Sequence, residues 1–121
     1  MRLQHISVAI DADGAGAARA FYGGLLGLEE KPVPPKLDAS QLVWFGVGED
    51  LEVHLMRTGD APPPNAHFCL AVDFGLEALR ARLEAAGVET STPTEIVGRP
   101  RFMCRDPFGN RVEVTELPAQ G

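Results

Sequence analysis

Two histidines begin two copies of one seven-residue pattern, and this repeat is the clearest sign of chemistry in the sequence. Residues 5–11 (HISVAID) and 67–73 (HFCLAVD) both read His, apolar, small, apolar, Ala, β-branched, Asp. Because successive side chains of a strand alternate between two faces, His5 and His67 would each begin a face of small residues opposite an apolar face. The repeat therefore predicts two ligand-type side chains that point into a cavity.

The same alternation adds two more side chains to these faces. In the expected strands 51–56 and 111–116 the apolar residues share one face, which leaves His54 and Glu113 on the inward face. All three histidines of the chain thus fall on inward faces, and the repeat makes the positions equivalent in pairs, 5 with 67 and 54 with 113. Three imidazoles and one carboxylate suit a borderline divalent ion. The sequence predicts a Zn, Ni, Fe, Mn or Co ion in each site, with the metal ligands His5, His54, His67 and Glu113.

Each histidine strand should be followed by a helix and three further strands. In the first half, Asp11 or Asp13 would cap the helix and Gly27 would end it. The spacing of its apolar residues predicts a buried stripe of Ala17, Phe21, Leu25 and Leu28. The strands that follow are expected near 28–31, 41–47 and 51–56.

The second half repeats this order. Asp73 would cap a helix over 76–86, Gly87 would end it, and its apolar face is formed by Leu76, Leu79 and Leu83. Strands are expected near 88–90, 101–105 and 111–116. The proline-rich segment 61–66 separates the halves, because prolines lack a backbone donor and fix φ. The sequence predicts a single α+β domain over residues 1–121, built from two tandem βαβββ modules at about 1–60 and about 66–118.

Composition excludes several classes of partner. The net charge of −6 argues against nucleic acid, which usually meets a basic surface. No apolar run approaches the ~18 residues of a membrane span, and the N-terminus runs directly into a strand pattern. We therefore expect a cytoplasmic protein with no membrane partner. Cys69 and Cys104 lack the spacing of a metal knuckle or redox pair, and are expected to be buried, reduced thiols.

From Leu3 to about Glu116 the chain resembles the vicinal oxygen chelate superfamily, which includes glyoxalase I, extradiol dioxygenases and bleomycin-resistance proteins. The resemblance is carried by the segments LQHISV (3–8), AFYGGLLGL (20–28), VHL (53–55), HFCLAV (67–72) and DPFGNRVE (106–113). It implies a half-open barrel that pairs to enclose a metal cavity, and it assigns the metal to His5, His54, His67 and Glu113. By analogy with small members, two chains would form a homodimer.

The resemblance implies a metal-dependent enzyme that binds two neighbouring oxygens of a small substrate. Lyase or isomerase chemistry through a metal-stabilised enolate is the favoured branch, with Glu113 as the first choice of catalytic base and His54 as the second. Where glyoxalase I has a glutamate and methylmalonyl-CoA epimerase a glutamine, this sequence has His54. The dioxygenases and thiol transferases use two histidines and one glutamate, which match His5, His67 and Glu113 and leave His54 as an extra ligand or an acid/base.

Alternatives to that branch are an extradiol-type dioxygenase and a non-catalytic protein that sequesters a bulky cationic ligand, as bleomycin-resistance proteins do. Arg99 and Arg101 are candidate substrate-binding residues that would anchor a carboxylate or phosphate on an anionic substrate. Trp44 is a candidate aromatic wall of the cavity, with core packing as the alternative. Arg111 shares the face of Glu113 and would either orient it or form a simple salt bridge.

Overall fold

The computed structural model describes residues 1–118 and divides into two compact units. The first unit contains Met1–Pro63 together with Pro107–Gly109, and the second contains Pro64–Asp106 and the chain from Asn110 onward. The boundary between Pro63 and Pro64 falls inside the predicted proline-rich segment. That the two modules act as a single domain stays a prediction.

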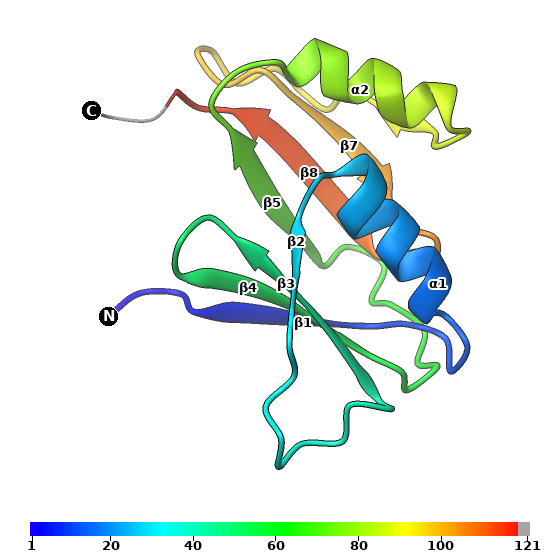
Figure 1. The fold of residues 1–121 in the computed structure, drawn as a ribbon. Coiled ribbons are helices and arrows are strands. Elements are labelled where there is room, and N and C mark those ends of the chain that lie inside the picture. Colours follow the sequence, from blue (N-terminus) through cyan, green and yellow to red (C-terminus); the bar gives the residue numbers. More distant parts are fainter. Residues whose placement is uncertain (119–121) are drawn as a thin grey trace. The chain divides into compact units, whose positions relative to one another are not determined.

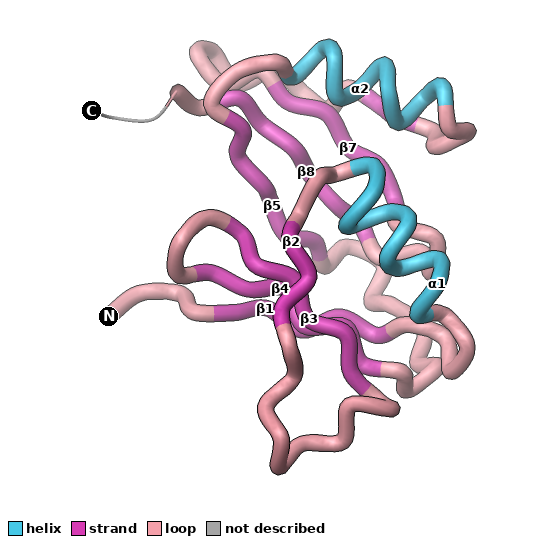
Figure 2. The backbone as a smooth tube through the Cα atoms, in the orientation of Figure 1, coloured by secondary structure: helices cyan, strands magenta, loops and turns pink. Residues whose placement is uncertain are grey.

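The first unit has the predicted βαβββ order (Figure 1). Its elements are β1 (His5–Ala9), α1 (Ala15–Ala18), the π-helical segment η1 (Arg19–Leu25), β2 (Glu29–Lys31), β3 (Leu42–Val47) and β4 (Leu51–Met56). The sheet has the strand order β1-β4-β3-β2, in which β1 and β4 are parallel and the other pairs are antiparallel. A long loop connects β2 to β3 (Figure 2).

The second unit repeats this arrangement. Its elements are β5 (His67–Val72), α2 (Leu76–Ala85), β6 (Thr90–Ser91), β7 (Arg101–Arg105) and β8 (Arg111–Glu116). The strand order is β5-β8-β7-β6, again with one parallel pair, β5 with β8. The chain is therefore an α+β protein with two four-stranded mixed sheets, one in each βαβββ module.

The core of the first unit lies between its helix and one face of its sheet. Phe45 and Val53 are 1 % exposed, and the ring of Tyr22 lies 5.8 Å from that of Phe45. The predicted helix stripe was wrong at Ala17, which is exposed, while Ala18 is fully buried. The buried face of the helix therefore starts one residue later than the spacing indicated.

Both predicted aspartate caps are wrong. The residue before α1 is Gly14, and no side chain caps that helix. The residue before α2 is Gly75, whose φ of 82° is left-handed, and the Leu76 N–H donates to Glu116 Oε1 at 3.2 Å. A carboxylate at a helix N-terminus is favourable because the first N–H groups lack partners inside the helix. Here that carboxylate comes from the last strand of the unit, not from the residues preceding the helix.

Helix α1 begins against an aromatic ring. A Cβ built on Gly14 would lie 2.5 Å from Cε1 of Phe108 and 3.0 Å from the Asp11 carbonyl oxygen. Only a residue without a side chain fits there, which explains a glycine at the start of a helix. Among the described residues, no helix has the length and hydropathy that a membrane span requires.

Candidate functional site

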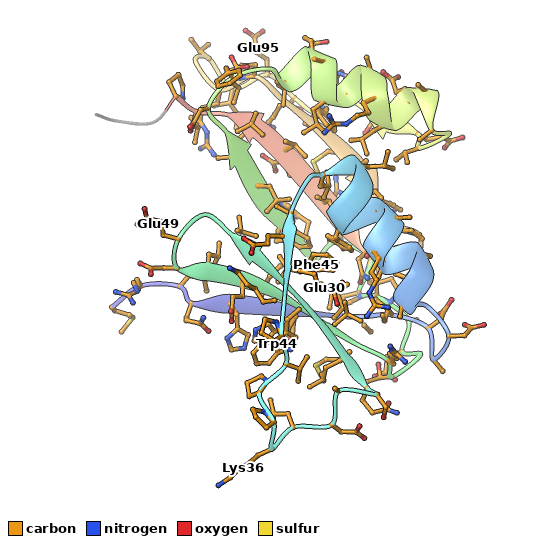
Figure 3. All side chains as sticks on the ribbon, in the orientation of Figure 1. Glu30, Lys36, Trp44, Phe45, Glu49 and Glu95 are labelled. Atoms are coloured by element: carbon orange, nitrogen blue, oxygen red, sulfur yellow. The ribbon has the colours of Figure 1, made fainter. Side chains whose placement is uncertain are left out.

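The polar face of the first sheet carries a stack of three aromatic rings. The strand register places His54 on β4 beside Ser7 of β1 and Trp44 of β3. The Trp44 and His54 rings are 3.7 Å apart with an interplanar angle of 4°, and the His54 and His5 rings are 4.1 Å apart at 18°. His54 thus lies between the other two rings. Trp44 and its neighbour Phe45 leave β3 toward opposite faces (Figure 3), so Trp44 lies on the histidine face and Phe45 in the core.

A chain of hydrogen bonds ties the two histidines of this stack together. His54 Nε2 donates to Glu52 Oε1 at 3.0 Å, and Gln4 Nε2 donates to the same oxygen at 3.2 Å. His5 Nδ1 donates to Gln4 Oε1 at 2.7 Å. The hydrogen bond with His54, and then that from Gln4, lowers the pKa of Glu52, because both favour its charged form. Glu52 was not predicted to be a site residue, although strand alternation alone places it on the face of His54.

The polar face of the second sheet is centred on Glu113, which is 6 % exposed. His67 Nε2 and Arg101 Nη1 each lie 3.4 Å from Glu113 Oε1. His67 Nδ1 donates to the Asn65 carbonyl oxygen at 3.2 Å. The arginine that contacts Glu113 is therefore Arg101, which reaches it from β7, and not Arg111, the candidate from strand alternation.

The hydrogen-bond partners sort the three histidines into two kinds. A carbonyl oxygen can only accept, so the Nδ1 atoms of His5 and His67 carry a proton, and in the neutral rings their Nε2 atoms keep the lone pair. His54 is the reverse, because its Nε2 donates to a carboxylate and its Nδ1 keeps the lone pair. A metal-ligating histidine usually donates its other ring N–H to such an acceptor. All three histidines match that arrangement, but His5 and His67 would present Nε2 to an ion whereas His54 would present Nδ1.

The second sheet offers a suitable pair of donor atoms for a metal ion. Zn–N and Zn–O distances near 2.1 Å with a tetrahedral angle separate the two donors by about 3.4 Å. The distance between His67 Nε2 and Glu113 Oε1 is 3.4 Å. These two residues therefore fit a shared divalent ion.

The first sheet fits less well as a source of two ligands. Imidazole lone pairs lie in the ring plane, and the planes of His5 and His54 are nearly parallel. Such rings direct their lone pairs side by side, so in this arrangement only one of them can serve a given ion. Within residues 1–118 no group of three or more His, Cys, Asp or Glu side chains is gathered to hold a metal. The convergence of four ligands, two from each unit, stays a prediction.

The two thiols are free, as predicted, but only Cys104 is buried; the expected burial of Cys69 was wrong, because its residue is exposed on the polar face of β5. Partial burial, and then the charge of Glu113, raises the pKa of Cys69 to about 11. Burial raises the pKa of Cys104 to about 11 as well. A thiol is a nucleophile only as the thiolate, so neither cysteine is activated at neutral pH.

The predicted substrate-binding residues belong to both units. Trp44 lies on the histidine face of the first sheet, in contact with His54. Arg101 is largely buried beside Glu113, and Arg99 lies in the loop before β7. The structure thus places each beside a candidate ligand or on an adjoining loop, and the roles of all three stay predictions.

Comparison with known proteins gives a consistent picture. The family model described as Glyoxalase-like domain matches residues 7–115. A protein from Bacillus anthracis, described as belonging to the glyoxalase family, is 32% identical, with 96% of this chain and 94% of that chain covered and a TM-score of 0.86. A lactoylglutathione lyase from Agrobacterium tumefaciens is 27% identical, with 95% and 92% covered and a TM-score of 0.73.

The same fold also occurs in a protein that is described by its binding of an antibiotic and not by an enzymatic activity. TnmS3, an antibiotic binding protein from Streptomyces sp. CB03234, is 23% identical, with 98% of this chain and 97% of that chain covered and a TM-score of 0.73. At that identity the likeness concerns the fold alone. No curated protein sequence matches this chain.

Proposed function

Because the chain belongs to the glyoxalase-like domain family of the vicinal oxygen chelate superfamily, we propose that it is a metal-dependent enzyme acting on a small substrate. The observation that carries the proposal is the pair His67 and Glu113, whose donor atoms are 3.4 Å apart. In the neutral ring of His67, Nε2 keeps its lone pair because Nδ1 donates to a backbone carbonyl. Both atoms are therefore available to the same cation.

We assign the third ligand to His5 and leave His54 outside the ligand set. His5 presents Nε2 in the same tautomer as His67, supported by Gln4 as His67 is by Asn65. His54 is the fourth ligand expected from the sequence, but its ring is stacked nearly parallel on that of His5 and its free lone pair is on Nδ1 and not on Nε2. The resulting set of two histidines and one carboxylate leaves coordination positions open for substrate.

A divalent ion held by these residues would polarise two neighbouring oxygens of a substrate. The protein supplies the proton transfer. Glu113, once its carboxylate is displaced from the ion or lies behind its direct ligands, is the first base that we propose, and Arg101 orients this carboxylate from 3.4 Å. His54 is the second, because Glu52 fixes its ring while Nδ1 keeps a lone pair that can accept a proton.

Lyase or isomerase chemistry is the branch that we favour, and similarity to a lactoylglutathione lyase supports it. In this branch a proton moves between carbon atoms beside a carbonyl group. An extradiol-type dioxygenase is the alternative within the enzyme class, since a set of two histidines and one carboxylate also suits ferrous iron and O₂. The two branches differ in that only the second consumes O₂.

The ligand assignment predicts different metal affinities for the three histidine variants. Chelator-treated protein should bind Zn, Ni, Mn or ferrous iron in calorimetric titration, and His67→Ala and His5→Ala should each weaken binding at least ~10-fold. His54→Ala is the matched control, and should stay within a few-fold of the unmodified protein. If no divalent ion binds or raises the melting temperature, the enzyme proposal fails; equal losses in all three variants would restore the four-ligand set.

Activity assays separate the two enzyme branches. Protein loaded with Ni or Mn should turn over a 2-oxoaldehyde hemithioacetal, and Glu113→Gln should lose most of that turnover because its amide cannot accept the proton. Iron-loaded protein with a panel of catechols in an oxygen electrode tests the alternative. Stoichiometric O₂ uptake with a ring-opened product would replace the lyase or isomerase proposal by the dioxygenase one.

A second candidate function is metal-free sequestration of a bulky ligand. The ring stack of Trp44, His54 and His5 favours it, because a flat aromatic group can extend such a stack by offset contact. Trp44 is the only tryptophan of the chain, so its fluorescence reports on that surface alone. Saturable quenching by bleomycin in chelator-treated protein, lost in Trp44→Leu, would support sequestration over catalysis.

A further inference from the structure

A cavity of about 490 Å³ lies within the second unit. It is lined by Glu77 and Arg80 of α2 and by residues of the loop between β6 and β7, up to Arg101. Figure 3 labels Glu95, which belongs to this loop. The volume is within the range of roughly 300–1,000 Å³ that is typical of small-molecule sites.

The charge of this lining differs in sign from that of the whole chain. The chain carries a net charge of −6, yet the cavity has three arginines, Arg80, Arg99 and Arg101, against the two carboxylates Glu77 and Glu95. Guanidinium groups that gather around a concave surface raise the local concentration of anions and bind carboxylate or phosphate oxygens in a bidentate way. The hydroxyls of Thr92 and Thr94 add polar groups to the lining.

Two of the three arginines are held in place by the protein. Arg80 donates through Nε to Thr90 Oγ1 and through Nη1 to Thr92 Oγ1, both at 2.9 Å. Arg101 donates through Nη2 to the Thr94 carbonyl oxygen at 2.6 Å, while its Nε is buried without a partner. Their positions are therefore set before a ligand arrives, which reduces the ordering cost of binding.

Arg99 differs from both. It is exposed, and its guanidinium group forms no hydrogen bond or ion pair with any residue in the part of the chain that the structure describes; only its backbone N–H donates, to the Ile96 carbonyl oxygen at 3.0 Å. Its charge acts on the nearby Cys69 thiol, whose pKa it lowers against the larger opposing effects. Arg99 is thus the cation whose donors are open to a ligand.

From this arrangement we propose that the cavity binds the carboxylate or phosphate group of a small molecule, with Arg99 as the main contact and with Arg80 and Arg101 supplying a fixed positive field. Arg101, which lines the cavity, also contacts Glu113 at 3.4 Å and so connects the cavity to the His67 and Glu113 pair. Under the proposed function, on which this step rests, the anion is the charged end of the substrate. Binding of the anion itself needs no metal.

Chelator-treated protein should bind inorganic phosphate or acetate saturably, measured by calorimetry at an ionic strength held constant with chloride. Arg99→Gln should weaken binding at least ~10-fold, because it removes a charge-assisted contact. Arg82→Gln is the matched control, an arginine on α2 outside the cavity lining, and should leave the affinity unchanged. Glu95→Gln should strengthen binding, because it removes a competing carboxylate from the lining.

The comparison of the two anions identifies the ligand group, since phosphate and acetate represent its two sources. His67→Ala should retain the anion while losing the metal, which separates this proposal from the proposed function. Anion binding without any metal binding would support the cavity assignment and contradict the proposal of a metal-dependent enzyme. Absence of saturable binding for both anions, or equal affinities of Arg99→Gln and Arg82→Gln, would overturn the cavity assignment.

Discussion

Each histidine of this chain donates one ring N–H to a neighbour, and that neighbour decides which nitrogen keeps a lone pair. His5 and His67 donate through Nδ1 to carbonyl oxygens of Gln4 and Asn65, close to them in the sequence. His54 donates through Nε2 to a carboxylate on its own strand. Residues of one type on equivalent faces therefore differ in chemistry, which is why we assign two of them to a metal and the third to proton transfer.

At the same scale, the thiol of Cys69 should react slowly in spite of its exposure. Its pKa is raised to about 11, so the thiolate fraction at pH 8 is about one thousandth. The higher nucleophilicity of a more basic thiolate offsets part of this, and alkylation by iodoacetamide should be roughly ten times slower than that of a free thiol. The rate can be measured by mass spectrometry of the alkylated protein at several pH values, in a Cys104→Ser variant in which Cys69 is the remaining thiol.

A variant of Glu113, the acidic neighbour of Cys69, provides a control for the predicted slow alkylation. Glu113→Gln removes a negative charge, so it should lower the pKa of Cys69 and accelerate alkylation at pH 8. If Cys69 with Glu113 intact were alkylated at pH 8 as fast as the thiol of glutathione, the raised pKa of Cys69 would be contradicted.

At the scale of elements, the two helices are held at their starts by distant parts of the chain. The first turn of α2 receives a carboxylate from Glu116, forty residues along the sequence from Leu76. The start of α1 contacts the ring of Phe108 in the turn between β7 and β8, which belongs to the first compact unit. Helix positions in this fold thus depend on strands and turns that follow much later.

This packing predicts opposite effects for two neighbouring glycines. Gly14→Ala should lower the free energy of unfolding by about 1–3 kcal/mol, because its Cβ would overlap Phe108 and crowd a backbone carbonyl. Gly16→Ala meets nothing within 4 Å and should be neutral or raise that free energy by up to ~1 kcal/mol through helix propensity. Urea denaturation of both variants tests the pair. Equal stability of the two would show that the ring does not restrict this position.

At the scale of the whole molecule, the chemistry-bearing side chains are divided between two units. His5 and His54 belong to the first unit, and His67 and Glu113 to the second. By the family resemblance we predict a homodimer in which such halves complete each other between chains.

Mixing two inactive variants tests this assembly. His5→Ala and Glu113→Ala homodimers should each have impaired metal sites, whereas a heterodimer of the two chains should regain one intact site. Metal titration of the refolded mixture, compared with each variant alone, measures the recovery. A monomer in sedimentation at micromolar concentration would contradict the prediction.

Strand positions and faces could be predicted from the sequence because alternation is a local property. The bounds of β4, β7 and β8 agree with the predicted strands, and His54 and Glu113 lie on the polar faces as expected. The internal repeat likewise predicted two βαβββ modules and their two sheets. These features depend on the order of polar and apolar residues within a few positions of each other.

The contacts among the site residues were decided by the tertiary structure. The sequence offered Arg111 as the partner of Glu113 and Asp73 as the cap of α2, but Arg101 and Glu116 occupy those roles. Glu52 became part of the site only through its bonds to His54 and Gln4. Periodicity assigns a residue to a face, whereas its partner depends on strand register and side-chain reach across the sheet, which only the folded chain determines.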